Sequence, residues 1–279
     1  MNPLKIYLLD LTYDTITLST EAFPLNIGYI AAYTKERFGP NVEITLFKYI
    51  ADVERELKKS PPDILGVSNY SWNSNLSEHV ASIAKEVNPN VTTAQGGPNF
   101  PHDDKQQIDF LKSRPSTDIF MIMEGEITTT NVIKRLIESD LDRKKIFSSP
   151  IDGAVFIQPS SRNSSKVLFR KGNPSERIKF LDDIPSPYLS GLLDKFLNGM
   201  FVPAFETARG CPFLCTFCDQ GLDQTKITTF SVKRMAEEIM YVGKKISHSQ
   251  IMGTYIYQFS CMVTGTYLWG CLLYTSDAA

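Results

Sequence analysis

Residues 1–140 alternate short apolar runs, rich in β-branched side chains, with longer segments whose apolar residues recur at helical spacing. This alternation is typical of a parallel sheet whose strands are joined by helices. Five strands are expected, at Leu4–Asp10, Val42–Tyr49, Ile64–Ser68, Val91–Gln95 and Ile119–Met123. Five helices are expected at Leu25–Phe38, Asp52–Lys58, Leu76–Val87, Asp104–Lys112 and Ile127–Glu138. The pattern predicts a doubly wound α/β domain of flavodoxin-like type, with Gly39 ending the first helix as a left-handed cap.

The loops after three of these strands are rich in small, polar and glycine residues. The third strand runs into Ser68-Asn69-Tyr70-Ser71-Trp72-Asn73, the fourth into Gln95-Gly96-Gly97-Pro98 and the fifth into Glu124-Gly125-Glu126. Ligands of doubly wound sheets bind beyond the carboxyl ends of the strands, and glycine lets a bulky ligand approach the backbone. These loops are the candidate ligand site, although each glycine also suits a tight turn of an ordinary α/β domain.

Residues 141–200 are expected to connect this domain to a second one. Ala154–Ile157 and Val167–Phe169 flank the polar turn Ser160–Ser165, which predicts a hairpin. Ile184-Pro185-Ser186-Pro187 cannot form a regular helix, because proline lacks an amide hydrogen and its ring clashes with the preceding turn. The stretch around these prolines is predicted to be a linker.

The densest chemistry lies in residues 206–221, ETARGCPFLCTFCDQG, where Cys211, Cys215 and Cys218 are spaced Cys-x3-Cys-x2-Cys. Three thiolates this close can bind a soft metal centre and leave it one coordination position open. A structural zinc site would need four ligands, usually as two separated pairs. Disulfides would need an oxidising compartment, and the chain opens without an apolar run long enough for a signal peptide. A ferredoxin-type carrier would need a fourth cysteine nearby, whereas Cys261 and Cys271 are distant.

The cysteine spacing, with an Arg-Gly before it and Phe217 before the last cysteine, resembles the cluster loop of the radical S-adenosylmethionine (radical SAM) enzymes. The resemblance implies that Cys211, Cys215 and Cys218 hold three irons of a [4Fe-4S] cluster, whose fourth iron binds S-adenosylmethionine. One electron into the cluster then cleaves the sulfonium and releases a 5′-deoxyadenosyl radical. Phe217 would lie against the adenine, although an aromatic residue at this place also suits a hydrophobic core.

The loops after the third, fourth and fifth strands resemble those of the cobalamin-binding domain that precedes the barrel in one radical SAM subgroup, where Gly-Gly-Pro and Gly-Glu turns recur. The Ile-Pro-Ser-Pro stretch resembles the segment before that barrel. By this resemblance the corrin site includes Ser68, Tyr70, Gly96, Gly97, Glu124, Gly125 and Glu126. The nucleotide tail of the cofactor would enter the sheet edge.

One motif of cobalt-coordinating domains is incomplete here. Those domains use Asp-x-His-x-x-Gly after the first strand, whereas Asp10 is followed by Thr12 at the histidine place and Thr15 at the glycine place. Cobalamin bound without a protein histidine, and loss of the cofactor, are both compatible with this departure. The glycine turns favour binding.

The cysteine loop is expected to follow the first strand of a (β/α) barrel, at Pro203–Thr207, because loops after barrel strands form the active face. Ser231 is expected to cap a helix that carries Met235, Ile239 and Val242 on its packing side. A complete barrel of this type takes about 250 residues. The residues around and after the cysteines are therefore expected to form only the start of a barrel.

The last part of the chain changes character. Residues 249–276 contain no Asp, Glu, Lys or Arg, although 22% of the whole chain is charged. Threonine, serine, glutamine and glycine residues interrupt the apolar run, so no membrane span is expected. The ending CLLYTSDAA resembles translated read-through of a sequencing adapter, and a frame change near residue 250 would explain the loss of charge. The chain is thus expected to be a C-terminally truncated, inactive fragment.

These patterns predict four parts: a cobalamin-binding-like domain at 1–140, a linker with a hairpin at 141–200, the start of a radical SAM barrel at 201–250, and an artefactual or frame-shifted tail at 251–279. The predicted function is that of a cobalamin-dependent radical SAM enzyme, with [4Fe-4S] cluster, S-adenosylmethionine and cobalamin as cofactors. Among the reactions that the resemblance implies is methyl transfer to an unactivated carbon. The alternative is a non-catalytic iron-sulfur or corrin binding module, a sensor or carrier.

The resemblance also implies a flavodoxin or ferredoxin as the reductant. The net charge of −2 gives no indication of nucleic-acid binding. Five cysteines, three of them clustered, suit the reducing cytoplasm, where thiols and a cluster survive.

Overall fold

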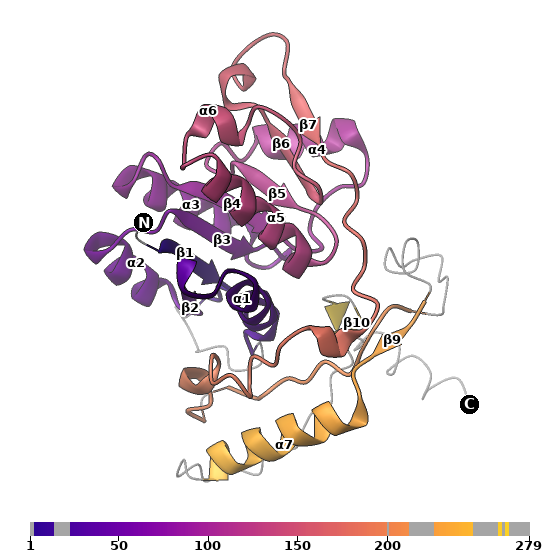
Figure 1. Cartoon of the computed structure of the whole chain (residues 1–279). Coiled ribbons are helices and arrows are strands. Elements are labelled where there is room, and N and C mark those ends of the chain that lie inside the picture. Colours follow the sequence, from indigo (N-terminus) through magenta and orange to yellow (C-terminus); the bar gives the residue numbers. More distant parts are fainter. Residues whose placement is uncertain are drawn as a thin grey trace, which may run out of the picture. The chain divides into compact units, whose positions relative to one another are not determined.

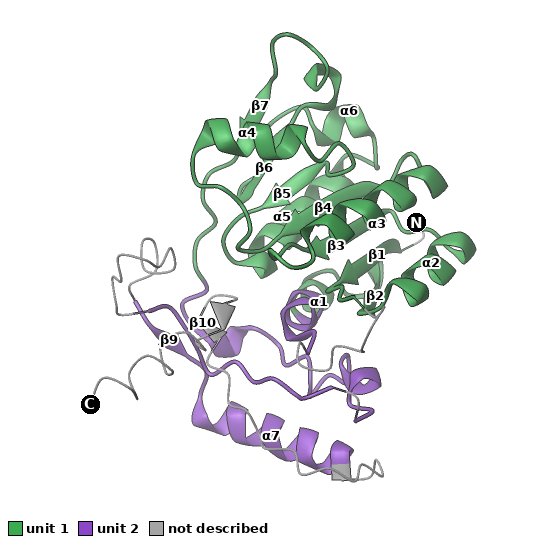
Figure 2. Ribbon diagram, turned by 180° about the vertical axis from the view of Figure 1, so that it is seen from behind, with its two compact units in different colours: residues 1–18, 33–177 green, residues 19–32, 178–279 purple. Residues whose placement is uncertain are grey.

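The structure is a computed structural model of the chain and describes residues 3–13, 23–199, 201–211 and 226–247, with the short strands 262–263 and 266–267 (Figure 1). It divides into two compact units (Figure 2). Unit 1 comprises residues 1–18 and 33–177, and unit 2 comprises residues 19–32 and 178–279. Helix α1 (Leu25–Phe38) begins in unit 2 and ends in unit 1.

Unit 1 is built on one sheet of seven strands in the order β2-β1-β3-β4-β5-β6-β7. The strands are β1 (Leu4–Leu9), β2 (Val42–Phe47), β3 (Ile64–Ser68), β4 (Thr92–Gly96), β5 (Ile119–Met121), β6 (Ala154–Ile157) and β7 (Phe169–Lys171). The first five strands are parallel, whereas β6 and β7 pair antiparallel. The order 2-1-3-4-5 is that of flavodoxin-like sheets, so the predicted fold class is confirmed.

Helices cover both faces of this sheet (Figure 1). One face carries α2 (Ile50–Lys59), α3 (Ser74–Val87) and α4 (Asp104–Lys112), and the other carries α5 (Gly125–Glu138) and the part of α1 that belongs to unit 1, residues 33–38. On the first face, Leu65 and Val67 of β3 pack in one cluster with Val53 of α2 and Val80 of α3. The strands are therefore covered by apolar side chains on both sides, as the near-continuous apolar runs of the sequence indicate.

Most predicted bounds agree with the structure to within three residues. Helices α1 and α4 and strand β3 have the predicted bounds, and Gly39 follows α1 with a φ of +53°, the left-handed cap expected there. Strand β5 is shorter than predicted, because Met123 has a φ of +65° and leaves the extended conformation. The short helix α6 (Arg143–Ile146) was not expected.

The predicted hairpin forms as β6 and β7, but it belongs to the sheet rather than to a linker. Phe120 of β5 pairs with Val155 of β6, so the hairpin extends the sheet beyond residue 140, the expected end of the first domain. Unit 1 accordingly continues to residue 177. The division of the chain into four functional parts stays a prediction.

Unit 2 contains β8 (Ala208–Arg209), β9 (Thr228–Thr229), α7 (Val232–Ser247), β10 (Met262–Val263) and β11 (Thr266–Tyr267). Ser231 caps α7 as expected, with Oγ accepting from the Arg234 amide at 3.1 Å. The expected strand at Pro203–Thr207 is wrong, because a strand needs a hydrogen-bonded neighbour and the ladder here begins only at β8, antiparallel to β9. In the part of the chain that the structure describes, no helix is both long and apolar enough to cross a membrane.

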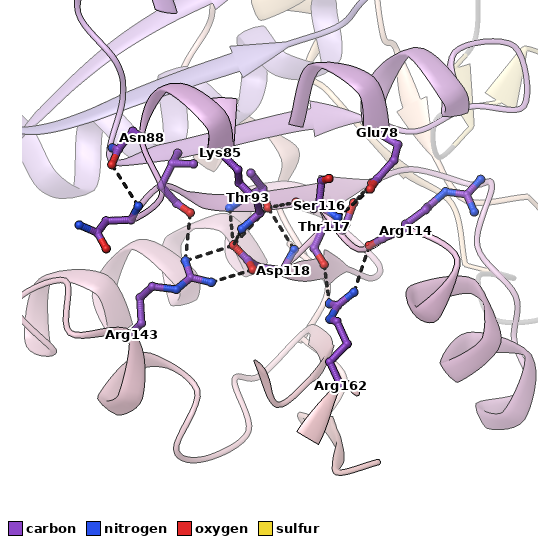
Figure 3. Close-up of polar contacts among 12 residues, drawn as sticks. Glu78, Lys85, Asn88, Thr93, Arg114, Ser116, Thr117, Asp118, Arg143 and Arg162 are labelled. Carbon is purple, nitrogen blue, oxygen red and sulfur yellow. Dashed lines mark hydrogen bonds and ion pairs between the residues drawn. The ribbon is translucent and has the colours of Figure 1, made fainter. Parts of the chain in front are cut away.

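A buried polar cluster ties the amino ends of β4 and β5 to the helices α3 and α6 (Figure 3). Asp118 accepts hydrogen bonds from Lys85 Nζ at 2.7 Å, Arg143 Nη2 at 2.8 Å and the Thr93 amide at 3.0 Å. Glu78 of α3 accepts two more from the turn before Asp118. This cluster lies at the opposite end of the strands from the loops predicted to bind a ligand, so its role is to hold unit 1 together.

Replacing Asp118 by asparagine should lower stability in a pH-dependent way. Burial raises the pKa of the Asp118 carboxyl, but Lys85 and Arg143 lower it by more, so the pKa lies below its usual range. Such a carboxyl stabilises the fold above its unfolded-state pKa of about 3.9, and the contribution is lost as pH falls through the folded pKa. We expect Asp118→Asn to cost about 3 kcal/mol of unfolding free energy at neutral pH and much less in acid.

Urea unfolding of both proteins at neutral and acid pH measures this difference. The control is Asp52→Asn, because Asp52 pairs with Arg55 at the surface, where both side chains are largely exposed, and should change stability by less than about 1 kcal/mol. A loss from Asp118→Asn of equal size at both pH values would contradict the prediction.

Candidate cofactor-binding site

Asp10, Lys48 and Ser68 form a buried polar chain across the carboxyl ends of β1, β2 and β3. Lys48 Nζ lies 2.9 Å from Asp10 Oδ2, and Ser68 Oγ donates to Asp10 Oδ1 at 2.6 Å. The Lys48 and Asp10 side chains are only 2% and 9% exposed. Strand β1 has β2 on one side and β3 on the other, so the chain connections diverge here. This is the switch point at which doubly wound sheets bind ligands.

Asn73 fixes the loop that follows β3. Its Nδ2 donates to the Leu11 carbonyl at 3.1 Å and to Ser68 Oγ at 3.3 Å, and its Oδ1 accepts from the Tyr70 amide at 2.8 Å. The turn presents Trp72, which is 50% exposed and stacks on Tyr70 with ring centroids 4.4 Å apart. A flat apolar face at the carboxyl edge of the sheet therefore rests on a turn whose polar groups are already paired.

The predicted Gly96-Gly97 turn brings the ends of β3 and β4 into close contact. The Asn69 amide donates to the Gly96 carbonyl at 2.7 Å. Gly97 has a φ of +140°, and a Cβ there would overlap the Asn69 carbonyl oxygen. A Cβ on Gly96 would meet only ordinary contacts with Met121, at 3.5 Å. Glycine is thus required at 97 by the close approach of two backbones, and not at 96.

Three amide side chains lie beside this turn. Asn69 Nδ2 donates to Gln95 Oε1, and Asn99 Nδ2 donates to Asn69 Oδ1 at 2.9 Å. Gln95 is fully buried, and its Nε2 has no acceptor among the residues that the structure describes. The sequence places Gln95 at the start of the predicted loop without indicating a role for it; a glutamine in a strand that is buried on both faces is the signal that could have singled it out.

Of the residues predicted in the loop after β5, Glu124 lies in the loop, whereas Gly125 and Glu126 are the first two residues of α5; both glutamates are buried. Arg177 Nε lies 3.3 Å from Glu124 Oε1. Gly125 begins α5, and Met123 before it is 40% exposed. Because β3, β4 and β5 are neighbours in the sheet (Figure 1), the structure brings the three predicted loops to one edge.

Asp10 does not orient a histidine in this structure. Thr12, at the histidine place of the cobalt-coordinating motif, is buried, and its amide donates to the Lys48 carbonyl at 3.3 Å. Both carboxylate oxygens of Asp10 are engaged by Lys48 and Ser68 instead. Thr15 lies outside the described residues.

The approach to the cysteine loop lies in unit 2. Cys211 is described and is a free thiol, partly exposed. Cys215, Phe217 and Cys218 lie outside the described residues. Gly210 has a φ of +97°, and a Cβ there would overlap the Lys226 carbonyl oxygen. Arg209 Nε and Nη2 pair with the two carboxylate oxygens of Glu206 at 3.1 and 3.0 Å, and both side chains are buried. This ion pair and Gly210 fix the backbone that leads into Cys211.

The residues at the carboxyl edge of unit 1 fit a corrinoid. A corrin is a wide, largely apolar ring with amide side chains around it, and a nucleotide tail hangs from one of them. Trp72 offers an exposed aromatic face, Gly97 keeps the backbone free of a side chain, and Gln95 holds a buried donor without an acceptor. Such a mixture of apolar surface and a few polar groups is typical of cofactor sites.

Comparison with protein families identifies the domain. Residues 12–133 match the model of the B12 binding domain. The match begins at Thr12, so it leaves out Asp10 but includes Lys48, Ser68, the Gly96-Gly97 turn and the loop after β5.

Two methyltransferases are among the characterised proteins that are similar to this chain. The 2-(S-pantetheinyl)-carbapenam-3-carboxylate methyltransferase of Streptantibioticus cattleyicolor is 28% identical over 232 residues, 79% of this chain and 32% of that protein. The cobalamin-dependent radical SAM methyltransferase TokK of Streptomyces tokunonensis is 30% identical over 190 residues, 66% of this chain and 26% of that protein. The chain thus spans about a third or less of the length of these relatives.

Among solved structures, the fold is similar to that of OxsB, a cobalamin-dependent S-adenosylmethionine radical enzyme, in its complex with aqua-cobalamin and S-adenosylmethionine. The TM-score is 0.66 at 21% identity, over 89% of this chain and 33% of that one. This likeness concerns the fold, and the matching family model and relatives agree with it. Residues 12–133 thus carry a B12-binding domain, and the chain is similar in sequence to methyltransferases that include the cobalamin-dependent radical SAM enzyme TokK.

Proposed function

We propose that this chain is the cofactor-binding part of a cobalamin-dependent radical SAM enzyme that cleaves S-adenosylmethionine reductively. The observation that carries the proposal is that one chain contains two features: a B12-binding domain at residues 12–133, followed by the Cys-x3-Cys-x2-Cys loop at 211–218. Either feature alone is compatible with a carrier or a sensor. Their combination is the arrangement expected of an enzyme that uses both cofactors.

When bound, a [4Fe-4S] cluster supplies the electron that cleaves S-adenosylmethionine, and cobalamin supplies a carrier for a methyl group. The thiolates of Cys211, Cys215 and Cys218 would hold the cluster, and Phe217 would lie against the adenine. Glu206 and Arg209 would hold the strand before Cys211 in place through their buried ion pair. The loops after β3, β4 and β5 would hold the corrinoid.

We further propose methyl transfer as the reaction class. The support is that the two relatives described above are methyltransferases by name, one of them cobalamin-dependent. A flavodoxin or ferredoxin in the cytoplasm would supply the electron. The residues that bind the substrate would lie outside the two cofactor sites.

Anaerobic reconstitution of the full chain tests the proposal. The protein is incubated with iron, sulfide and hydroxocobalamin, desalted, and analysed for bound metal. We expect about four irons and one cobalamin per chain. S-adenosylmethionine cleavage after reduction, measured in a longer protein that includes the rest of the relatives' length, separates an enzyme from a carrier. Iron and cobalamin bound without any cleavage in that protein would favour the binding module instead.

A further inference from the structure

Gln95 occupies an unusual position for a neutral amide. Its side chain is 0% exposed, and Gln95 pairs in register with Val67 of β3, a residue of the apolar cluster between the sheet and α2 and α3. Gln95 Oε1 accepts from Asn69 Nδ2, but Gln95 Nε2 has no acceptor in the described part of the chain. A buried donor without an acceptor costs about 1–3 kcal/mol.

The three amides form a directed chain of hydrogen bonds. Asn99 Nδ2 donates to Asn69 Oδ1 at 2.9 Å, and Asn69 Nδ2 donates to Gln95 Oε1. Turning the Gln95 amide over would place its Nε2 against that Nδ2, and two donors would face each other. The unpaired donor is therefore a consequence of the three-amide arrangement. An apolar side chain of the same length would avoid its cost.

The polar chain on the neighbouring strand ends differs in this respect. Ser68 donates to Asp10 and accepts from Asn73, and the Asn73 amide is paired at both ends. That network is complete without a ligand. Among the side chains described above at the carboxyl ends of β3 and β4, the donor that lacks an acceptor is thus Gln95 Nε2, directly before the Gly96-Gly97 turn.

We propose that Gln95 is a specificity residue of the corrinoid site, whose Nε2 donates to an acceptor on the nucleotide tail, either an oxygen or an unprotonated ring nitrogen. This inference rests on the proposed cobalamin binding. The tail is favoured over the ring because Gln95 is 0% exposed and its side chain lies on a covered face of the sheet, directly before the Gly96-Gly97 turn. Only a narrow or flat part of the ligand can reach that depth, and a corrin ring is too wide.

Binding of two corrinoids to the full chain tests the inference. Cobalamin has the nucleotide tail, whereas cobinamide has the same ring and lacks the tail. We expect Gln95→Met to weaken cobalamin binding about tenfold, the effect of one lost hydrogen bond of about 1.4 kcal/mol, and to leave cobinamide binding unchanged. Unchanged cobinamide binding also shows that the variant still folds.

Two further variants separate the donor from its surroundings. Gln95→Leu is a second apolar replacement without a donor, so it should lose cobalamin affinity as Gln95→Met does. Thr92→Val is the matched control, because Thr92 lies at the other end of the same strand and also has a buried, unpaired side-chain oxygen in the described structure. It should bind both corrinoids as the unaltered chain does.

Equal weakening of cobalamin and cobinamide by Gln95→Met, or no weakening of either, would overturn the role of Gln95. An unaltered chain that binds neither corrinoid would overturn the proposed cobalamin function itself, and the inference with it. Binding of both corrinoids with equal affinity by the unaltered chain would show that the tail makes no contact, and would also reject the role of Gln95.

Discussion

Cys215→Ala is expected to remove the iron-sulfur cluster from the reconstituted protein. Each of the three thiolates holds one iron in the proposed arrangement, and S-adenosylmethionine fills the position at the fourth. With one thiolate removed, two protein ligands remain for a centre that needs three. Bound iron should fall from about four per chain to near zero, and the absorption of the cluster, with the electron paramagnetic resonance of its reduced form, should disappear with it.

The matched control is Cys271→Ala. Cys271 is a cysteine of the same chain but outside the Cys-x3-Cys-x2-Cys loop, so its removal should leave iron content unchanged. Cobalamin binding should survive both substitutions, because the residues that match the B12-binding domain, 12–133, include neither cysteine. Unchanged iron content in Cys215→Ala, or equal loss in Cys271→Ala, would show that the three-cysteine loop is not the cluster site.

The parallel part of the fold could be predicted because its signals are local. Gly39 marks the end of α1, and the apolar run Ile64–Ser68 is bounded by prolines on one side and a polar loop on the other. In α1 and β3 the hydrophobic pattern and the residues at the element boundaries agree, and both elements have the predicted bounds. Met123 shows the limit of this reasoning: its left-handed φ shortens β5, and no residue type announces it.

The role of the hairpin could not be read from its own residues. A pair of strands with a polar turn is recognisable from the sequence, but which sheet it joins depends on an edge presented elsewhere. Here β5 offers that edge, and Phe120 pairs with Val155. The expected strand at Pro203–Thr207 failed for the converse reason. Its residues suit a strand, but no described segment provides the ladder.

The candidate cofactor site, like the fold, could be predicted only in part. Residues at strand ends could be assigned to one edge of the sheet, because the carboxyl ends of parallel strands meet there. Which of these residues pair with each other depends on register and side-chain reach. Lys48 was missed because it follows β2, whose loop has no glycine turn, and only the structure shows its ammonium against Asp10. The unpaired amide of Gln95 is likewise a property of three side chains together.

Lys48→Met should produce a large loss of stability through the buried pair that it breaks. The substitution removes the cation and keeps most of the side chain's length, so Asp10 is left as a buried carboxylate whose remaining partner is Ser68. Breaking a buried ion pair in this way costs about 3–5 kcal/mol. The free energy of unfolding, measured by urea at neutral pH, should fall by that amount.

The control is Lys171→Met. Lys171 pairs with Asp104 at 2.6 Å, but the two side chains are 40% and 62% exposed, so this pair should contribute less than about 1 kcal/mol. The double variant Asp10→Asn with Lys48→Met should lose much less than the sum of the two single losses, because it leaves no unpaired charge. Additive losses would mean that the two side chains do not stabilise the switch point as a pair. If the double variant then binds cobalamin as the unaltered chain does, the pair serves the fold alone; weaker binding at restored stability would show that it also positions the loops that Ser68 and Asn73 hold together.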